Sequence, residues 1–306
     1  MKKGLVIKST GSWYLVRHNN EVVKCRIKGK FRTKGLRTTN PIAVGDKVLW
    51  EIEEDGMGTI SEIEPRENYI IRKSINLSKE SHIIAANMDQ AFLFVTVHAP
   101  QTSTGFIDRF LVTAEAYSIP VQIIFNKMDT YNQKWLNKVD ELEKIYSNIG
   151  YPCHRVVATS QEGVAYLSAL MKDKITLLSG HSGVGKSTLI NSLEDMELKT
   201  DEVSDSHNKG KHTTTFAEMY PLKIGGYVVD TPGIKGFGII DIEKAELGHF
   251  FPEIRDVMNE CKFNNCVHLN EPGCAVKQAV SVGEISESRY VNYLSLYNDE
   301  EGQHYR

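Results

Sequence analysis

The chain has 306 residues, of which 41% are hydrophobic and 25% are charged, and its formal net charge is −3. This composition excludes a disordered or fibrous protein, and the length predicts two or three domains. No apolar stretch approaches the roughly 18–20 residues of a membrane span, and the apolar run that follows Met1 is shorter than a signal-peptide core. We therefore expect a cytoplasmic protein with no membrane partner.

Positive charge is concentrated at the start of the chain. Residues 1–50 hold eight lysines and four arginines against one glutamate and one aspartate, a net charge of +10, whereas the rest of the chain carries −13. A basic block of domain size is typical of a module that binds a polyanion, most often RNA or DNA. A solvated basic face without a partner is the alternative.

The first domain is expected at residues 1–73, where short apolar runs alternate with turn residues. The expected strands lie at residues 13–16, 21–27, 46–52 and 59–63. Four or five strands at this spacing predict a small barrel of the five-stranded oligonucleotide-binding type, which grips a phosphate backbone with its loops. The residues expected to contact RNA lie in one basic loop: Lys28, Lys30, Phe31, Arg32, Lys34 and Arg37.

The hydrophobic pattern changes in the second expected domain, residues 74–239, where continuous apolar runs alternate with helical segments. The runs lie at residues 91–97, 121–125, 155–158, 175–178 and 227–229. Strands that are buried on both faces have this pattern, so an α/β domain with a parallel sheet covered by helices is predicted. The third expected domain, residues 240–306, is mainly helical and contains a cluster of cysteine and histidine.

Residues 180–187 read G-H-S-G-V-G-K-S and match the phosphate-binding pattern G-x-x-x-x-G-K-[ST] without a mismatch. An expected strand precedes the match and an expected helix follows it, so backbone N–H groups and the helix N-terminus can converge on phosphates. Lys186 would reach the β- and γ-phosphates, and Ser187 would bind Mg²⁺. A glycine-rich turn that fits by chance is the alternative. The expected phosphate contacts are Gly180, His181, Ser182, Gly183, Val184, Gly185, Lys186, Ser187 and Thr188.

A second motif, N-K-M-D at residues 126–129, follows an expected strand and predicts the base. The Asp129 carboxylate can accept hydrogen bonds from both N1–H and the 2-amino group of guanine, donors that adenine lacks there. Asn126 would hold the loop and contact the base edge, and the stem of Lys127 would cover the base plane. Taken alone, the motif also fits a helix N-terminus capped by Asp129. Together the two motifs predict a site for GTP or GDP.

Two further segments predict a switch that senses the γ-phosphate. Asp230 and Gly233 belong to D-T-P-G, where a GTPase places its Mg²⁺-associated aspartate and its phosphate-sensing glycine. The segment G-K-H-T-T-T at residues 210–215 can offer a threonine hydroxyl to Mg²⁺, and we assign this role to Thr214.

The attacking water needs a group that orients it. Ile234 stands where Ras-like enzymes have a glutamine, and an apolar side chain cannot perform that role. His212 is the candidate, because imidazole can hydrogen-bond water at neutral pH, and an ordinary surface histidine is the alternative. The predicted catalytic residues are Lys186, Asp230, Gly233 and His212. A backbone N–H near Ala158 or Thr159 is expected to meet the guanine carbonyl.

The order of the motifs is circularly permuted, since N-K-x-D precedes the phosphate loop instead of following D-x-x-G. The same sheet forms if the chain is opened elsewhere and its old ends are joined. D-x-x-G then leads directly into the C-terminal region, so the nucleotide state is expected to move that domain.

Three cysteines and one histidine lie close together: Cys261, Cys266, His268 and Cys274. A Cys₃His set fills all four positions of a tetrahedral zinc site, which predicts one structural Zn²⁺ holding a small helical domain. Free buried thiols beside a surface histidine are the alternative. The isolated Cys25 and Cys153 are expected to be core residues.

These motifs together resemble the circularly permuted, ribosome small-subunit-dependent GTPase A family of bacteria over nearly the whole chain. The resemblance rests on the basic barrel, N-K-M-D, G-H-S-G-V-G-K-S-T, G-K-H-T-T-T, D-T-P-G and C-K-F-N-N-C-V-H-L-N-E-P-G-C. It implies a late assembly factor of the small ribosomal subunit that binds ribosomal RNA and hydrolyses GTP faster on the subunit than alone. The residues themselves predict an RNA-binding, zinc-containing GTPase that uses Mg²⁺ with GTP and is a monomer by default.

Two other functions are considered. In one, GTP gates the docking of an RNA-binding module and hydrolysis is incidental. The other, a small-molecule kinase, is disfavoured because Asp129 demands guanine and no acceptor pocket is evident.

Overall fold

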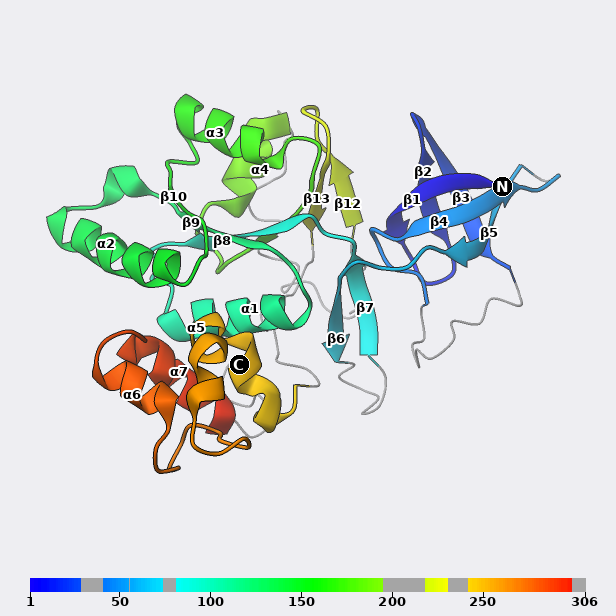
Figure 1. Cartoon of the computed structure of the whole chain (residues 1–306). Coiled ribbons are helices and arrows are strands. Elements are labelled where there is room, and N and C mark those ends of the chain that lie inside the picture. Colours follow the sequence, from blue (N-terminus) through cyan, green and yellow to red (C-terminus); the bar gives the residue numbers. More distant parts are fainter. Residues whose placement is uncertain (29–40, 55, 74–80, 195–217, 231–241, 299–306) are drawn as a thin grey trace, which may run out of the picture. The chain divides into compact units, whose positions relative to one another are not determined.

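The computed structural model describes residues 1–28, 41–54, 56–73, 81–194, 218–230 and 242–298 (Figure 1). The chain divides into two compact units, each of which draws on separate stretches of sequence. The first contains residues 1–92, 157–179 and 185–234, and the second contains residues 93–156, 180–184 and 235–306. None of the helices in the described stretches combines the length and apolar character needed to cross a membrane.

The first unit begins with five strands that close into a barrel. They are β1 (Lys2–Ser9), β2 (Tyr14–His18), β3 (Glu21–Ile27), β4 (Lys47–Ile52) and β5 (Gly58–Ile63). β1 pairs with β2 and β4, β2 pairs with β3, and β3 runs parallel to β5, which pairs with β4. Each strand therefore has two neighbours in the barrel, and the prediction of a five-stranded barrel of the oligonucleotide-binding type is confirmed.

Alternate residues of these strands fill the barrel core. In β3, for example, Cys25 is buried while Lys24 and Arg26 on either side of it are exposed. The buried residues of this core are Val6, Tyr14, Val16, Cys25, Ile42, Val48, Trp50 and Ile60. The basic residues that alternate with them therefore face solvent.

Strand β1 also connects the barrel to a second set of strands in the same unit. Lys8 of β1 lies opposite Glu218 of β12 (Glu218–Pro221), which pairs antiparallel with β13 (Tyr227–Asp230). β13 runs parallel to β11 (Ile175–Ser179). The sequence pattern predicted β11 and β13, but it did not predict the antiparallel strand β12 beside them.

Two antiparallel strands, β6 (Tyr69–Lys73) and β7 (Ser81–Ala86), form a separate ribbon in the first unit. The boundary predicted between residues 73 and 74 falls between these paired strands. The unit also contains the helices α3 (Gln161–Met171) and α4 (Lys186–Glu194). The chain passes from the first unit to the second within β8 (Gln90–Val95).

The second unit contains β9 (Val121–Phe125) and β10 (Cys153–Arg155), which run parallel, and the helices α1 (Thr104–Ala116) and α2 (Gln133–Asn148). The strand predicted at residues 155–158 therefore lies two residues earlier than expected. Val157 and Ser160 explain the shift, because the Ser160 hydroxyl donates to the Val157 carbonyl oxygen at 2.9 Å and accepts from Gly163 N–H at 3.0 Å. The chain has to leave the sheet to form this cap for α3.

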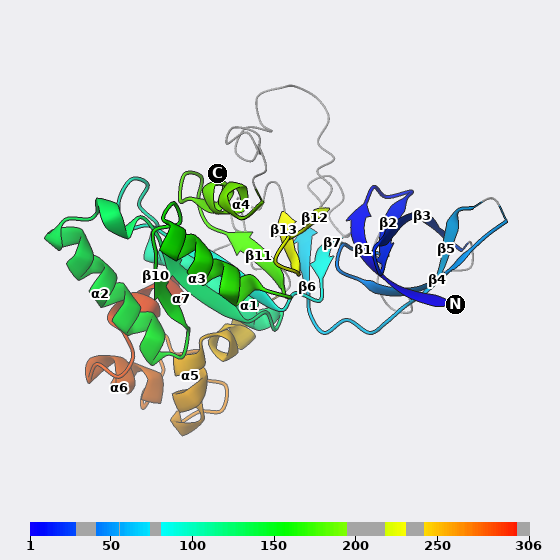
Figure 2. The same cartoon turned by 90° about the horizontal axis from the view of Figure 1, so that it is seen from above.

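The C-terminal part of the second unit is mainly helical, as predicted. Its elements are η2 (Lys244–Phe250), α5 (Pro252–Val257), η3 (Met258–Glu260), α6 (Ala275–Ser281) and α7 (Glu287–Asn298). They pack around one apolar cluster that also contains Val112 of α1. Figures 1 and 2 show these helices beside α1. We call residues 242–298 the C-terminal module.

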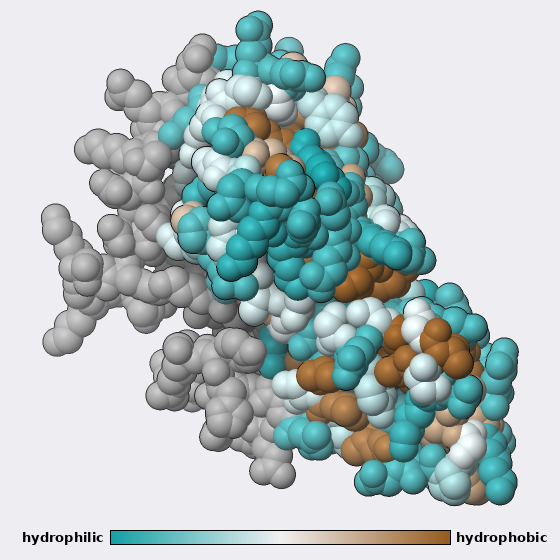
Figure 3. Space-filling model, turned by 90° about the vertical axis from the view of Figure 1, so that its left-hand side faces the viewer, coloured by the Kyte–Doolittle hydropathy of each residue, from teal (hydrophilic) through white to brown (hydrophobic). Residues whose placement is uncertain are grey.

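Part of the surface of the C-terminal module is apolar. Figure 3 shows hydrophobic side chains scattered over the lower part of its view, where these helices lie, while the upper part is mainly hydrophilic. The large exposed apolar side chains of the module are Phe263, Val282 and Val291.

Candidate functional site

The predicted phosphate loop has the backbone conformation that its glycines permit. Gly180, Gly183 and Gly185 have φ angles of +134°, +79° and +107°, a region that side chains disfavour. A Cβ atom at Gly180 would also lie 2.6 Å from the carbonyl oxygen of Phe94. Helix α4 begins at Lys186, directly after the last of these glycines. A glycine turn that opens a helix can direct its N–H groups toward an anion, so this loop is suited to phosphate.

The N-K-M-D segment contacts the phosphate loop directly. Asn126 follows β9 and is buried, and its backbone N–H donates to the carbonyl oxygen of Val95 at 3.0 Å. Its side-chain amide donates to the carbonyl oxygen of Val184 at 2.8 Å. Because Val184 lies in the middle of the phosphate loop, the two motifs predicted to share one nucleotide are joined by a buried hydrogen bond.

The rest of the N-K-M-D segment forms a tight turn. Lys127 has a φ of +63°, and its ammonium group donates to the carbonyl oxygen of Ala99 at 2.8 Å. Tyr131, which ends the turn, donates to the carbonyl oxygen of Asn126 at 2.8 Å. Burial raises the pKa of Tyr131 above its ordinary value of 10.0, so this bond persists at neutral pH and into the alkaline range.

Asp129 lies in the 3₁₀ turn η1 (Met128–Thr130) with an exposed side chain. The alternative role for Asp129, as a helix cap, is not observed, because α2 is capped by Asn132, whose side chain accepts from Trp135 N–H at 3.3 Å. The Asp129 carboxylate is therefore available to a ligand at the surface.

The loop at residues 157–160, expected to back the base, begins where the N-K-M-D turn is anchored. The Met128 N–H donates to the carbonyl oxygen of Val156 at 3.3 Å, one residue before the loop. Ala158 is buried and Thr159 is exposed. The contact of either N–H with a guanine carbonyl stays a prediction.

The predicted switch is described only in part. β13 ends at Asp230, and its parallel register with β11 pairs Val229 with Leu177. The ends of β11 and β13, at Ser179 and Asp230, therefore lie at the same edge of this pair of strands. His212, Thr214 and Gly233 lie outside the described residues.

The basic loop of the barrel is also described only in part. Lys28 follows β3, and its side chain is 62% exposed. Its Nζ lies 3.9 Å from Oε1 of Glu51. Five of the residues predicted to contact RNA lie outside the described residues: Lys30, Phe31, Arg32, Lys34 and Arg37.

The predicted metal ligands converge in the C-terminal module. The ligand atoms of Cys261, Cys266, His268 and Cys274 lie within 4.8 Å of one another, and all four residues are buried. Nδ1 of His268 lies 3.6 Å from Sγ of Cys261 and 3.5 Å from Sγ of Cys274, and these two sulfur atoms are 4.0 Å apart. Such separations fit a tetrahedron with bonds of about 2.0–2.3 Å to one central ion. This cluster can hold a metal.

The protonation of these groups also fits a metal site. Burial lowers the pKa of His268, so its imidazole is neutral at pH 7 and can act as a ligand. Burial raises the pKa of the Cys266 thiol to about 12. A thiolate is stable at this position only beside a cation, so metal binding has to release protons from the thiols.

The loop that carries His268 is held by other side chains. Glu271 accepts hydrogen bonds from the N–H groups of Val267 at 3.0 Å and Leu269 at 2.9 Å. Burial acts to raise the pKa of Glu271, but these bonds outweigh it and the pKa is lowered. Tyr290 of α7 donates to the carbonyl oxygen of His268 at 2.6 Å. The ligand geometry is therefore set by the module around it.

One contact of the phosphate loop was not predicted from the sequence. The ring of Phe106, in the first turn of α1, lies 4.0 Å from the ring of His181, centroid to centroid. No motif contains Phe106, and only the fold brings this helix to the loop. A helical apolar periodicity gives no signal for such a contact.

Comparison with known proteins decides the family. A family model described as RsgA GTPase matches residues 63–240, more than half of the chain, and one described as RsgA N-terminal domain matches residues 3–60. The chain belongs to the RsgA GTPase family. It is a GTPase, and its fold is the circularly permuted α/β domain that the motif order predicted, with the barrel before it and the helical Cys₃His module after it.

Individual members of the family are similar to this chain over nearly its full length. The small ribosomal subunit biogenesis GTPase RsgA of Bacteroides fragilis (strain YCH46) is 57% identical over 306 residues, covering 99% of each chain. The protein of the same name from Flavobacterium psychrophilum is 53% identical over 298 residues, covering 96% of this chain and 91% of the relative.

Two solved structures resemble this chain. The crystal structure of YjeQ from Thermotoga maritima has a TM-score of 0.77 and 39% identity and covers 97% of each chain. The structure of YloQ, described as a circularly permuted GTPase, has a TM-score of 0.76 and 35% identity and covers 97% of this chain and 94% of YloQ.

Proposed function

We propose that this RsgA-family protein is an assembly factor that hydrolyses GTP, binds the small ribosomal subunit and its ribosomal RNA in the cytoplasm, and acts late in the maturation of the subunit. The observation that carries the nucleotide part is the hydrogen bond from Asn126 to Val184, which joins a base-reading motif to a phosphate loop. The ribosomal part rests on relatives above 50% identity that are named small ribosomal subunit biogenesis GTPases.

Within the site, Asp129 reads guanine and the loop 180–187 binds the phosphates. Lys186 contacts the β- and γ-phosphates. Mg²⁺, bound with GTP, is held by Ser187 and Thr214 with Asp230 nearby, and Gly233 senses the γ-phosphate. This assignment is supported by the positive φ angles of the glycines in the loop and by the exposed carboxylate of Asp129.

The ion in the C-terminal module is proposed to be one structural Zn²⁺. Three thiols and one imidazole leave no open position for water in a tetrahedral site, and thiolate ligands favour zinc over harder cations. The separations of 3.5–4.0 Å among the three measured ligand pairs support this assignment. Three domains are proposed, at residues 1–73, 74–239 and 240–306.

The barrel is proposed to bind ribosomal RNA through its basic surface. Besides Lys28, the exposed residues Lys24 and Arg26 lie on the outward side of β3. The Lys24 ammonium lies 4.2 Å from the centre of the Trp13 ring, so positive charge and an aromatic surface occur together. Proteins that bind single-stranded nucleic acid combine these two features. Because the contacts are electrostatic, affinity for RNA should fall steeply as salt rises.

The experiment that tests the function measures GTP turnover by the full-length protein with and without purified small ribosomal subunits. Stimulation by the small subunit, and not by the large one, is expected. Equal turnover in all three conditions would contradict the proposal. His212→Ala should reduce the stimulated rate by about 10²-fold or more while leaving the affinity for GTP unchanged, because it removes a water-orienting group and no binding contact.

A second function deserves a parallel test, in which GTP gates docking and hydrolysis is incidental. Docking to the subunit is compared with GTP and with a non-hydrolysable analogue, and release is timed. If hydrolysis matters, release is fast with GTP and slow with the analogue. Equal release with both nucleotides would favour the gated module.

A further inference from the structure

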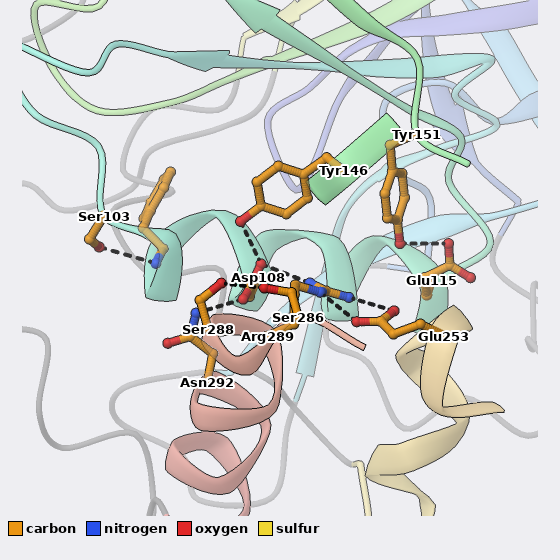
Figure 4. Close-up of polar contacts among 11 residues, drawn as sticks. Ser103, Asp108, Glu115, Tyr146, Tyr151, Glu253, Ser286, Ser288, Arg289 and Asn292 are labelled. Atoms are coloured by element: carbon orange, nitrogen blue, oxygen red, sulfur yellow. Dashed lines mark hydrogen bonds and ion pairs between the residues drawn. The ribbon is translucent and has the colours of Figure 1, made fainter. Parts of the chain in front are cut away.

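Arg289 of α7 is a buried arginine outside the nucleotide and metal sites. Its side chain is 1% exposed and forms ion pairs with Asp108 of α1 at 2.7 Å and with Glu253 of α5 at 2.6 Å. Figure 4 shows the three side chains converging between the helices. A buried ion pair adds little net stability because desolvation offsets the attraction. The two ion pairs of Arg289 connect α7 to both α1 and α5.

Asp108 is the centre of this network. One carboxylate oxygen accepts from Arg289 and from the Tyr146 hydroxyl at 2.8 Å, and the other accepts from the Asn292 amide at 2.6 Å. The donors come from α7 and α2, and Asp108 itself is fully buried. Because donors on two other helices bind this carboxylate, α1 can take only one position along its axis.

Helix α7 also contacts the metal loop, which is the segment that carries the predicted ligand His268. α7, which carries Arg289, also carries Tyr293, whose hydroxyl donates to the carbonyl oxygen of Val267 at 2.8 Å. Val267 precedes the ligand His268. One helix thus contacts both the metal loop and α1.

α1 contacts the phosphate loop two residues before Asp108. The N–H of Phe106 donates to the hydroxyl of Ser103, the cap of α1, at 3.2 Å, and the Phe106 ring packs on His181. Residues 180–184 belong to the same compact unit as α1 and the C-terminal module, whereas residues 185–234 belong to the other. The first half of the phosphate loop is therefore held by elements of this unit.

We propose that Arg289 is a positioning residue for the phosphate loop: it holds α1 through Asp108 and so keeps Phe106 against His181. The loop N–H groups are then preorganised for the nucleotide phosphates, and the C-terminal module contributes to nucleotide affinity. This inference rests on the proposed assignment of residues 180–187 to phosphate binding. A purely structural network would change stability and leave the affinity of the folded protein unaltered.

The test uses the full-length, metal-containing protein. Arg289→Lys keeps the charge but loses the planar group that donates to Asp108 and Glu253 at the same time, and Phe106→Leu removes the ring that packs on His181. Tyr151→Phe is the matched control, because it removes the 3.0 Å hydrogen bond to Glu115 at the far end of α1. Equilibrium titration with fluorescent GDP and GTP gives the dissociation constants, and thermal unfolding shows that each variant is folded.

Arg289→Lys and Phe106→Leu are each expected to raise the dissociation constants for GDP and GTP about threefold to thirtyfold. The preference for guanosine over inosine nucleotides should be unchanged, since Asp129 is untouched. A double variant that combines Arg289→Lys with Phe106→Leu should bind nucleotide no more weakly than the single variant with the lower affinity, because both changes remove the same effect. Tyr151→Phe should stay within about twofold of the wild type while its melting temperature falls.

Wild-type affinity in the folded Arg289→Lys or Phe106→Leu protein would overturn the inference, and so would additive losses in the double variant. If Arg289→Lys does not fold, Asn292→Ala takes its place under the same criteria, because it removes one donor to Asp108 at a partly buried position. Failure of the wild type itself to bind GTP would overturn the proposed nucleotide site as well. Equally tight binding by the wild type and the variants would overturn only the role of Arg289.

Discussion

The side-chain amide of Asn126 and the carbonyl oxygen of Val184 are joined by a buried hydrogen bond of 2.8 Å. Asn126 belongs to the segment proposed to read the base and Val184 to the loop proposed to bind phosphates. One contact therefore joins the two ends of the proposed nucleotide site. The two residues are far apart in the sequence. The N-K-M-D segment precedes the phosphate loop, and this order distinguishes a permuted GTPase from a regular one.

Replacing Asn126 should weaken binding of any guanine nucleotide. Asn126→Ala leaves the Val184 carbonyl without this donor and frees the phosphate loop, so the dissociation constants for GDP and GTP should both rise about tenfold, equivalent to about 1.4 kcal/mol. Fluorescent-nucleotide titration measures the change. Asn137→Ala is the matched control, since its amide is exposed and pairs only with Gln133 among the bonds described. An unaltered affinity for both nucleotides would contradict the role of Asn126.

Changing Asp129 should change which base is bound. Asp129→Asn replaces an acceptor by a donor, so GTP affinity should fall at least about a hundredfold while xanthosine triphosphate is gained, because the amide can donate to the 2-oxo group. Competition between the two triphosphates measures the exchange. Retained preference for GTP would remove Asp129 from base recognition.

Loss of one metal ligand should unfold the C-terminal module. The wild type is expected to hold one zinc ion per chain, and Cys274→Ser should lower metal affinity at least about a hundredfold and reduce helical signal, since folding of such a module depends on its ion. Elemental analysis and circular dichroism measure the two effects. Cys153→Ser is the matched control, because Cys153 lies outside the cluster. A full metal content in Cys274→Ser would exclude it as a ligand.

Alkaline pH should destabilise the barrel through Cys25. Burial raises the pKa of this thiol from 9.0 to about 11, so between these values the unfolded chain loses a proton that the folded barrel keeps. Stability is therefore retained below pH 9 and falls by about 1 kcal/mol per pH unit from pH 9 to pH 11. Urea unfolding of the wild type and Cys25→Ala isolates this contribution from other titrating groups. Parallel pH dependences in the two proteins would refute it.

The sequence predicted the barrel, the permuted order and the Cys₃His cluster because each has a local signal. Alternation along β3 places Cys25 inside and its basic neighbours outside, and the spacing of the ligands brings four donors into one loop. The metal cluster needs no knowledge of distant contacts. These features depend on residues close together in the chain, where periodicity and spacing are informative.

The sequence did not predict the contacts that depend on the packing of whole elements. Phe106 and Arg289 stand in helices whose apolar pattern indicates a buried face and says nothing of the partner. Asp108 gave no signal either, since a carboxylate in a helix is usually exposed. The strand predicted at residues 155–158 was displaced because the Ser160 cap competes with the sheet for the backbone. Whether a side chain or the sheet binds a given backbone group depends on the packing of the folded chain, which the sequence pattern does not contain.

Strand β1 closes the barrel through β4 and also pairs with β12. β12 lies in the sequence between G-K-H-T-T-T and D-T-P-G, the two segments expected to sense the γ-phosphate. A chain shortened to begin after the barrel would leave β12 as an open edge strand, available to pair with another copy. The barrel therefore protects β12 from self-association, and isolated fragments of this family that lack the barrel should be judged by their tendency to aggregate as well as by their turnover.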